Sequence, residues 1–352
     1  LRTRRQRQMC IRDRLKRVIP NIKFQFDDED GNPIPVERSE LVDVLSNGER
    51  RALYILNIIF EVEARKASGI KTLFVIDDIA DSFDYKNKYA IVEYLHDMLQ
   101  SDDFYQIILT HNYDFYRTVS TRLSLGGARY HTLKTTDKVS LEEDTNYKDV
   151  FQKWKNNAGQ NGNSEMLIAM IPFVRNLAEY CGYESEQNTL TSLLHIKEDT
   201  ESITTDDLQK VFRAVLHDKP DFTLPTPNKK VLGLIFDVAD GILKNPTVGI
   251  ELEKKIVLSI SIRLKTEQFL IKKIQDDNWV AGINSNQTAK LIKKFKQMFS
   301  DKKEQEENIK LVERVNLMTP ENIHLNSFMY EPILDMSNDH LKQLYKEVCL
   351  LV

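Results

Sequence analysis

The chain has 352 residues, of which 41% are apolar and 29% charged, and its formal net charge is −4. This composition is typical of a globular protein, and the length leaves room for two domains. The longest apolar stretches are interrupted well before the ~20 residues that a membrane-spanning helix needs. Cys10, Cys181 and Cys349 form no Cys-x-x-Cys pair, so the pattern indicates neither a zinc site nor a disulfide framework. We therefore expect a cytoplasmic protein without a membrane anchor.

Residues 1–14 contain six arginines and one aspartate. The run from Met9 to Arg14 resembles a translated sequencing adaptor, so we expect a non-native leader over 1–14. Without it the net charge changes from −4 to −9. The other interpretation is a basic arm that binds nucleic acid. The acidic remainder argues against a broadly basic surface, although it leaves room for a local basic groove.

The next segment predicts a hairpin between Ile22 and Val36, with its turn at residues 28–32. The sequence Leu-Ser-Asn-Gly-Glu at residues 45–49 then precedes the apolar run Ala52–Ala64, which predicts a buried helix. A helix that begins here presents free N–H groups and a positive dipole end to an anion. On these residues alone, an ordinary turn with Ser46 as the N-cap is the preferred interpretation, and only the motifs that follow favour an anion site.

Two short apolar runs predict neighbouring strands of a doubly wound α/β sheet. Residues 72–76 form a β-branched and aromatic run that ends at Asp77 and Asp78, and residues 107–110 form a second run that ends before His111. A helical pattern over residues 86–100 separates the two runs. Because ligands bind at the carboxyl edge of such sheets, we expect Asp77, Asp78 and His111 to lie together there.

The order of these motifs resembles the second half of an ABC-type ATPase head, as in chromosome-maintenance, double-strand-break-repair and RecF-like proteins. The resemblance implies a P-loop NTPase-like α/β fold for residues 15–150, with ATP and Mg²⁺ as cofactors. Asp77 then holds Mg²⁺ through its water shell, and Asp78 orients or deprotonates the attacking water. His111 corresponds to the switch histidine that hydrogen-bonds the γ-phosphate. Most such ATPases carry Glu where this chain has Asp78.

The same resemblance implies a homodimer of heads. The signature loop, formed by Ser46, Asn47, Gly48 and Glu49, then touches the γ-phosphate held by the opposite head, and Asp84 ends the D-loop. No Gly-x-x-x-x-Gly-Lys-Ser/Thr motif occurs in the chain. The Walker A lobe is therefore missing, and we expect this chain alone neither to bind ATP tightly nor to hydrolyse it.

The Gly- and Asn-rich text between Lys153 and Ser164 predicts a linker over residues 151–164. A mainly α-helical effector or interaction domain is expected over 165–352. Its helices are predicted at residues 166–181, 205–217, 229–243, 249–274, 285–299 and 338–350, and Arg129 to Leu141 predicts one more hairpin before the linker.

Arg263 and Glu267 lie four residues apart in this helical text and share a helix face. With His324 they resemble the ribonuclease domain of bacterial anticodon nucleases of the HEPN class, which defend against phage. The resemblance implies that His324 is the acid/base for 2′-hydroxyl attack, that Arg263 stabilises the charged phosphate, and that Glu267 orients His324, without a metal. RNA, including tRNA, is then the substrate.

A second pair, Arg175 and Glu179, has the same spacing, with His195 as a possible partner. The plainer interpretation is that these polar residues are buried ion pairs that organise a bundle. Three functions therefore stay open: a nucleotide-gated phage-defence effector, a DNA-clamping or repair-type ATPase with a non-catalytic helical platform, and a nucleotide sensor that recruits a separate effector.

Overall fold

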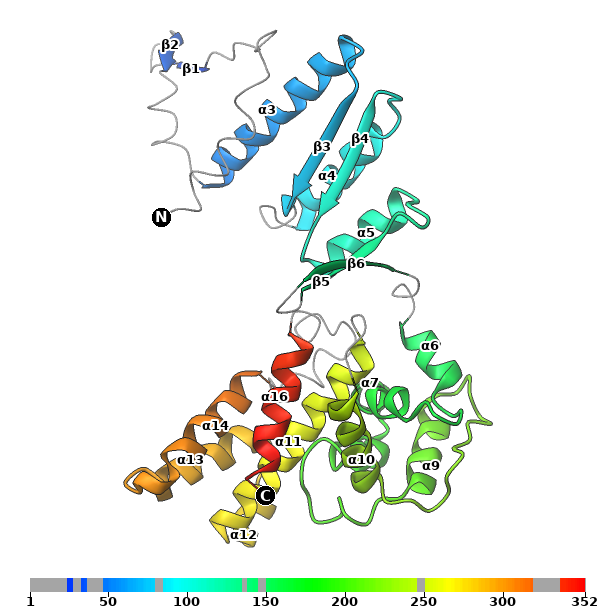
Figure 1. Cartoon of the computed structure of the whole chain (residues 1–352), viewed down its shortest axis with the longest axis vertical. Helices are drawn as coiled ribbons and strands as arrows, with labels where there is room; N and C mark the ends of the chain where they lie inside the picture. Colours follow the sequence, from blue (N-terminus) through cyan, green and yellow to red (C-terminus); the bar gives the residue numbers. More distant parts are fainter. Residues whose placement is uncertain are drawn as a thin grey trace. The chain divides into compact units, whose positions relative to one another are not determined.

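The structure is a computed structural model that describes residues 24–27, 33–36, 47–79, 85–134, 138–144, 150–245, 251–318 and 336–351. The chain divides into two compact units, residues 1–126 and residues 127–352 (Figure 1). The division falls between Gly126 and Gly127 and so precedes the linker expected at 151–164.

The first unit is built around two parallel strands. β3 (Thr72–Asp77) and β4 (Phe104–Leu109) pair in parallel, with Thr72 opposite Phe104 and Asp77 opposite Leu109. The helix α4 (Tyr85–Met98) connects them, α3 (Asn47–Ala67) precedes β3, and α5 (Tyr113–Arg122) follows β4. This order confirms the predicted alternation of helices and strands. The predicted N-terminal hairpin is also present, as antiparallel β1 (Phe24–Asp27) and β2 (Pro33–Val36).

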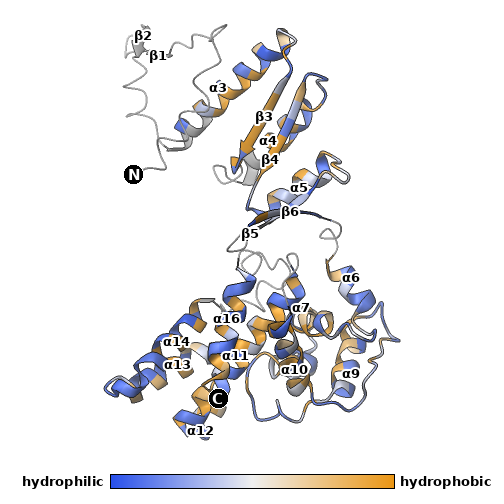
Figure 2. Cartoon of the chain, in the orientation of Figure 1, coloured by the Kyte–Doolittle hydropathy of each residue, from blue (hydrophilic) through white to orange (hydrophobic). Residues whose placement is uncertain are grey.

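Only one face of the parallel pair is covered within the described part of this unit. Phe74 and Ile76 of β3 and Ile108 of β4 pack into a core that includes Val62 of α3 and Phe115 of α5. On the opposite face five apolar residues are between 46% and 62% exposed: Leu73, Val75, Tyr105, Ile107 and Leu109. The strand pairing places Leu73 opposite Tyr105 and Val75 opposite Ile107, so these side chains form one apolar surface. Figure 2 shows the apolar character of both strands.

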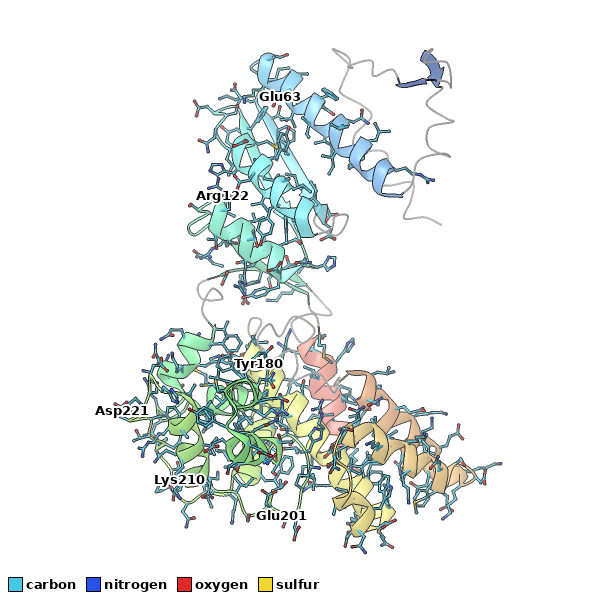
Figure 3. The ribbon with its side chains drawn as sticks, turned by 180° about the vertical axis from the view of Figure 1, so that it is seen from behind. Glu63, Arg122, Tyr180, Glu201, Lys210 and Asp221 are labelled. Atoms are coloured by element: carbon cyan, nitrogen blue, oxygen red, sulfur yellow. The ribbon has the colours of Figure 1, made fainter. Side chains whose placement is uncertain are left out.

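A surface ion pair joins the two helices that flank β4. Arg122 of α5 donates from Nε and Nη2 to the two carboxylate oxygens of Glu93 on α4, at 2.6 Å and 2.5 Å (Figure 3). Both groups are exposed to solvent, so the pair orients the helices more than it stabilises them.

The second unit begins with the antiparallel hairpin of β5 (Tyr130–Lys134) and β6 (Val139–Glu143), which confirms the predicted hairpin. The rest of its described part is helical: α6 (Val150–Asn157), α7 (Ser164–Cys181), α8 (Glu184–Thr191), α9 (Thr205–Val215), α10 (Val231–Lys244), α11 (Leu252–Ile274), α12 (Asp277–Ala281), α13 (Gln287–Phe299), the 3₁₀ turn η3 (Lys303–Gln305), α14 (Glu306–Met318) and α16 (Asn338–Cys349).

The helix α11 is the centre of this bundle. Sixteen of its 23 residues are buried, and it packs against α7, α10, α13, α14 and α16. One hydrophobic core lies around its first two thirds, and a second, smaller core surrounds its last turns together with α12, α13 and α14. A helix that is buried all round in this way organises the packing of its neighbours.

The six helices predicted between residues 166 and 350 are all present as α7, α9, α10, α11, α13 and α16. The expected linker is different, because residues 150–157 form α6, in which Trp154 is only 1% exposed. This tryptophan packs into the core of the helical unit, which explains why the segment is ordered as a helix. In the part of the chain that the structure describes, no helix is both long enough and apolar enough to cross a membrane.

Candidate functional site

The candidate nucleotide site lies at the carboxyl edge of β3 and β4. Both strands end in register, so the residues that follow them emerge side by side. Asp77 is the last residue of β3 and is exposed to solvent. After β4 the chain turns sharply into α5, because the Asn112 side chain caps that helix by accepting from the Phe115 N–H at 2.9 Å. His111 lies in this turn.

Asp78 and His111 are in direct contact. Asp78 Oδ1 accepts a hydrogen bond from the His111 backbone N–H at 3.2 Å and lies 2.9 Å from His111 Nδ1. The Asp78 N–H also donates to the Leu109 carbonyl at 2.9 Å, which carries the strand pairing one residue beyond Asp77. The predicted proximity of Asp78 and His111 at one edge of the sheet is therefore confirmed.

The backbone of Asp78 adopts a left-handed conformation with φ of +50°. A non-glycine residue pays roughly 1–2 kcal/mol for this conformation, although aspartate tolerates it better than most residues. The turn directs the Asp78 carboxylate toward β4 and His111. Backbone strain of this kind is concentrated at functional sites, so it adds to the reasons for placing a site here.

The signature loop is described only in part. Asn47, Gly48 and Glu49 form the first turn of α3, as expected for a loop that opens a helix. Ser46, before them, and Asp84, in the expected D-loop, lie outside the described residues. Neither the expected separation of Ser46 from Asp78 nor the role of Asp84 is therefore tested.

A second polar constellation is buried at the centre of the helical unit. The Glu267 side chain on α11 is fully buried and accepts four hydrogen bonds. Its Oε1 accepts from His195 Nδ1 at 2.8 Å and from Thr288 Oγ1 at 2.6 Å. Its Oε2 accepts from the Ile196 backbone N–H and from Gln287 Nε2, both at 2.8 Å. Glu267 thus ties the turn after α8 and the start of α13 to the central helix.

The donors around Glu267 keep it ionised. Burial alone raises the pKa of a carboxyl group, but the attraction of His195 and the hydrogen bonds from His195, Thr288 and Ile196 outweigh it, so the pKa of Glu267 lies below its ordinary value. An ionised Glu267 fixes the His195 tautomer, with the proton on Nδ1. Nearby, Lys197 donates from Nζ to the Ile283 carbonyl at 2.9 Å, and burial lowers the pKa of this lysine.

This arrangement differs from the expected ribonuclease site. A ribonuclease site has to be accessible to RNA, but Arg263 is 1% exposed and Glu267 is 0% exposed. The four donors also saturate the Glu267 carboxylate, which leaves it little capacity to orient another group. His324 lies outside the described residues, so its role stays a prediction.

His195 was a possible partner of Arg175 and Glu179, and the structure places its Nδ1 2.8 Å from Glu267 Oε1. Arg175 forms an ion pair with Glu179 and also donates to Asn176 Oδ1 at 3.0 Å. Sequence reasoning missed Gln287 and Thr288 as partners of Glu267, because two polar residues at the start of a helix look like ordinary capping residues.

The carboxylates at the sheet edge do not form a metal cage by themselves. In the described ranges no three His, Cys, Asp or Glu side chains come close enough to hold a metal ion. Comparison with protein-family models, with curated proteins and with solved structures found no match to this chain, so its function has to be inferred from the geometry of these two constellations.

Proposed function

We propose that the first unit is the Walker B and switch half of an ABC-type ATPase head, which binds Mg²⁺ and ATP when a phosphate-binding lobe and a second head complete it. The observation that carries the proposal is the contact between Asp78 and His111 at the carboxyl edge of β3 and β4, directly beside Asp77. One acidic strand end is common, but an acid pair that meets a histidine from the next parallel strand is the arrangement that the proposed phosphoryl-transfer site requires.

The donor set fits magnesium. Mg²⁺ is bound through one or two carboxylates, water and substrate phosphates, and not by a cage made of protein alone. Asp77 offers an exposed carboxylate of this kind. When bound, the metal would neutralise the charge that develops on the phosphates. Asp77 would hold it through water, Asp78 would orient the attacking water, and His111 would donate to the γ-phosphate.

The exposed apolar face of the sheet supports the proposal that a further lobe packs against this half of the head. Parallel sheets are normally covered on both faces, because their strands are rich in apolar residues. Here Leu73, Val75, Tyr105, Ile107 and Leu109 leave an uncovered apolar face in the described part of the first unit. A further lobe that carries the missing phosphate loop and its lysine would cover such a face. We also propose that ATP joins two heads, with the signature loop of one, Ser46–Glu49, completing the site of the other.

The helical unit would then respond to the state of the heads. The burial and saturation of Glu267 favour a structural role for this residue, and hence the alternative of a DNA-clamping or repair-type ATPase with a non-catalytic helical platform. A phage-defence ribonuclease stays the competing proposal, and it depends on His324. If His324→Ala abolishes cleavage of tRNA, the result favours the ribonuclease proposal. If cleavage is unchanged in this variant, the ribonuclease proposal is ruled out.

The metal site can be tested on this chain with Mn²⁺ and ATP at millimolar concentration, because the phosphate loop needed for tight binding is absent. We expect paramagnetic broadening of the amide resonances of Asp77, Asp78 and His111 in a ¹⁵N NMR spectrum. Asp77→Asn should remove it. Asp103→Asn is the matched control, because Asp103 precedes β4 at the opposite edge of the sheet. Broadening that is absent, or that persists in Asp77→Asn, would contradict the proposal.

A further inference from the structure

The end of the helical bundle forms a sub-bundle with its own core. The last turns of α11 pack with α12, α13 and α14 around Phe269, Leu270, Leu291, Phe295 and Val312. In Figure 1, α13 and α14 lie side by side next to the end of α11. The surface of this sub-bundle is therefore held by a rigid base.

One part of this sub-bundle, residues 272–303, carries a concentration of positive charge in an otherwise acidic chain. The stretch from Lys272 to Lys303 contains eight lysines, three aspartates and no glutamate or arginine, so its net charge is +5, whereas the whole chain has −4. The lysines are Lys272, Lys273, Lys290, Lys293, Lys294, Lys296, Lys302 and Lys303. All of them except Lys294 are exposed.

Three of these lysines share one face of α13, and two more lie in the last turn of α11. Leu291, Ile292 and Phe295 face the core of the sub-bundle, which leaves Lys290, Lys293 and Lys294 on the outer face of α13 at spacings of three and four residues. Lys272 and Lys273 lie in the last turn of α11. Lys294 connects the two groups, because its Nζ lies 3.4 Å from Asp276 at the N-cap of α12, three residues beyond Lys273.

Aromatic rings lie among these lysines. Lys294 Nζ lies 4.8 Å from the centre of the Trp279 ring, and Lys302 Nζ lies 4.8 Å from the centre of the Phe299 ring. Trp279 and Phe299 are both half-buried, so each ring keeps an accessible part. A basic surface with aromatic rings between its charges suits a nucleic-acid strand, since lysines bind its phosphates and rings stack with its bases.

Most of these lysines form no ion pair with the residues that the structure describes. Lys294 is paired with Asp276, and Lys296 is paired with Glu313 of α14. Lys272, Lys273, Lys290, Lys293, Lys302 and Lys303 have no carboxylate within 4.0 Å among the residues that the structure describes, although Lys290 also donates to Ser285 Oγ at 3.3 Å. As far as the described residues go, six lysine charges are therefore open to an external polyanion.

We propose that this surface, formed by α13, the last turn of α11 and the start of α12, binds the phosphate backbone of a single nucleic-acid strand. The 13 residues of α13 span about 20 Å, which is long enough to contact several successive phosphates of one strand. A membrane surface is the weaker candidate, because Met298 is the only large apolar residue of α13 that is exposed. The proposal is independent of the ATP site in the first unit.

Fluorescence anisotropy on the full chain tests it, with fluorescein-labelled 20-nucleotide RNA, DNA of the same sequence, and a 20-base-pair DNA duplex as probes. We expect Lys290→Glu/Lys293→Glu to weaken single-strand binding at least tenfold and to reduce the slope of log affinity against log salt by about two. Lys153→Glu/Lys244→Glu makes the same change of charge on α6 and α10, where both lysines are exposed, and should change affinity less than threefold.

Three outcomes would overturn the proposal: no binding of any probe at 50 mM salt, an equal loss of affinity in both double variants, or duplex binding that exceeds single-strand binding. Binding of labelled poly-glutamate but of no nucleic acid would indicate an acidic protein partner instead and would also overturn it. Intrinsic tryptophan fluorescence, which reports on Trp279 beside the surface, checks that the variants remain folded.

Discussion

Glu267→Gln is the sharpest test of the buried centre of the helical unit. The carboxylate accepts from four donors: His195, the Ile196 backbone, Gln287 and Thr288. An amide keeps one acceptor oxygen and turns an NH₂ group toward the other two donors. Rotation of the Thr288 hydroxyl and a change of the His195 tautomer recover part of the loss. With buried hydrogen bonds to a charged group worth about 1.5–3 kcal/mol each, we expect the unfolding free energy to fall by about 2–4 kcal/mol.

Urea unfolding followed by tryptophan fluorescence measures this change in the helical unit alone, because both tryptophans of the chain, Trp154 and Trp279, belong to it. Glu179→Gln is the matched control. Glu179 sits in an ion pair on the surface with its side chain 50% exposed, so the same substitution should cost less than about 1 kcal/mol.

The effect should also depend on pH in one direction. Glu267 has its pKa lowered in the folded protein, so its contribution is present above the ordinary value of 4.5 and is lost as the pH falls through the lower folded value. The difference between the wild type and Glu267→Gln should therefore be largest at neutral pH and shrink below pH 4.5. The structural role of Glu267 would be refuted if Glu267→Gln lowered the unfolding free energy only as much as Glu179→Gln does. It would also be refuted if the difference in unfolding free energy between the wild type and Glu267→Gln grew as the pH fell.

Three other substitutions test individual features. Asp78→Gly should be more stable than Asp78→Ala by about 1 kcal/mol in thermal unfolding, because φ is +50° there and glycine adopts it without steric cost. Val75→Asp should lower the fluorescence of the dye ANS, which binds exposed apolar surface, and should change the unfolding free energy by no more than about 0.5 kcal/mol, since Val75 is 62% exposed. The control is Leu350→Asp in the other unit, where Leu350 is 84% exposed, and it should leave the ANS fluorescence unchanged. Asp207→Asn should cost about 1 kcal/mol, measured by urea unfolding, because Asp207 forms a capping box with Thr204 on α9.

The strands and the candidate nucleotide edge were predictable from sequence for a physical reason. An apolar run that ends in acids marks the end of a strand, and the ends of parallel strands meet at one edge whatever the rest of the fold is. The contact between Asp78 and His111 follows from this rule and from a tight turn capped by Asn112. Most helices were predictable too, because the apolar residues recur with helical spacing over more than ten residues.

The partners of Glu267 were not predictable in the same way. His195 lies 72 residues before it and Thr288 lies 21 residues after it, and only the packing of α11 against the neighbouring turns brings them together. The helix α6, which lies where a linker was expected, was missed for a related reason. Its polar text indicates a linker, but Trp154 contributes one large side chain whose burial outweighs the local propensity.

The contact between Asp78 and His111 should be easy to break, and this property matters for the proposed site. The side chain of His111 is 63% exposed and that of Asp78 is 42% exposed, so the pair is worth less than about 1 kcal/mol. A phosphate group that approaches the sheet edge could therefore take His111 from Asp78 at small cost and leave that carboxylate ready to orient water. We expect His111→Ala to change the protection of β4 amides in hydrogen exchange by less than about 1 kcal/mol. Changes in chemical shift caused by ATP at Asp78 should disappear in the same variant. A loss of more than about 2 kcal/mol in β4 would mean that His111 holds the strand in place, and the contact would then be structural and not a phosphate switch.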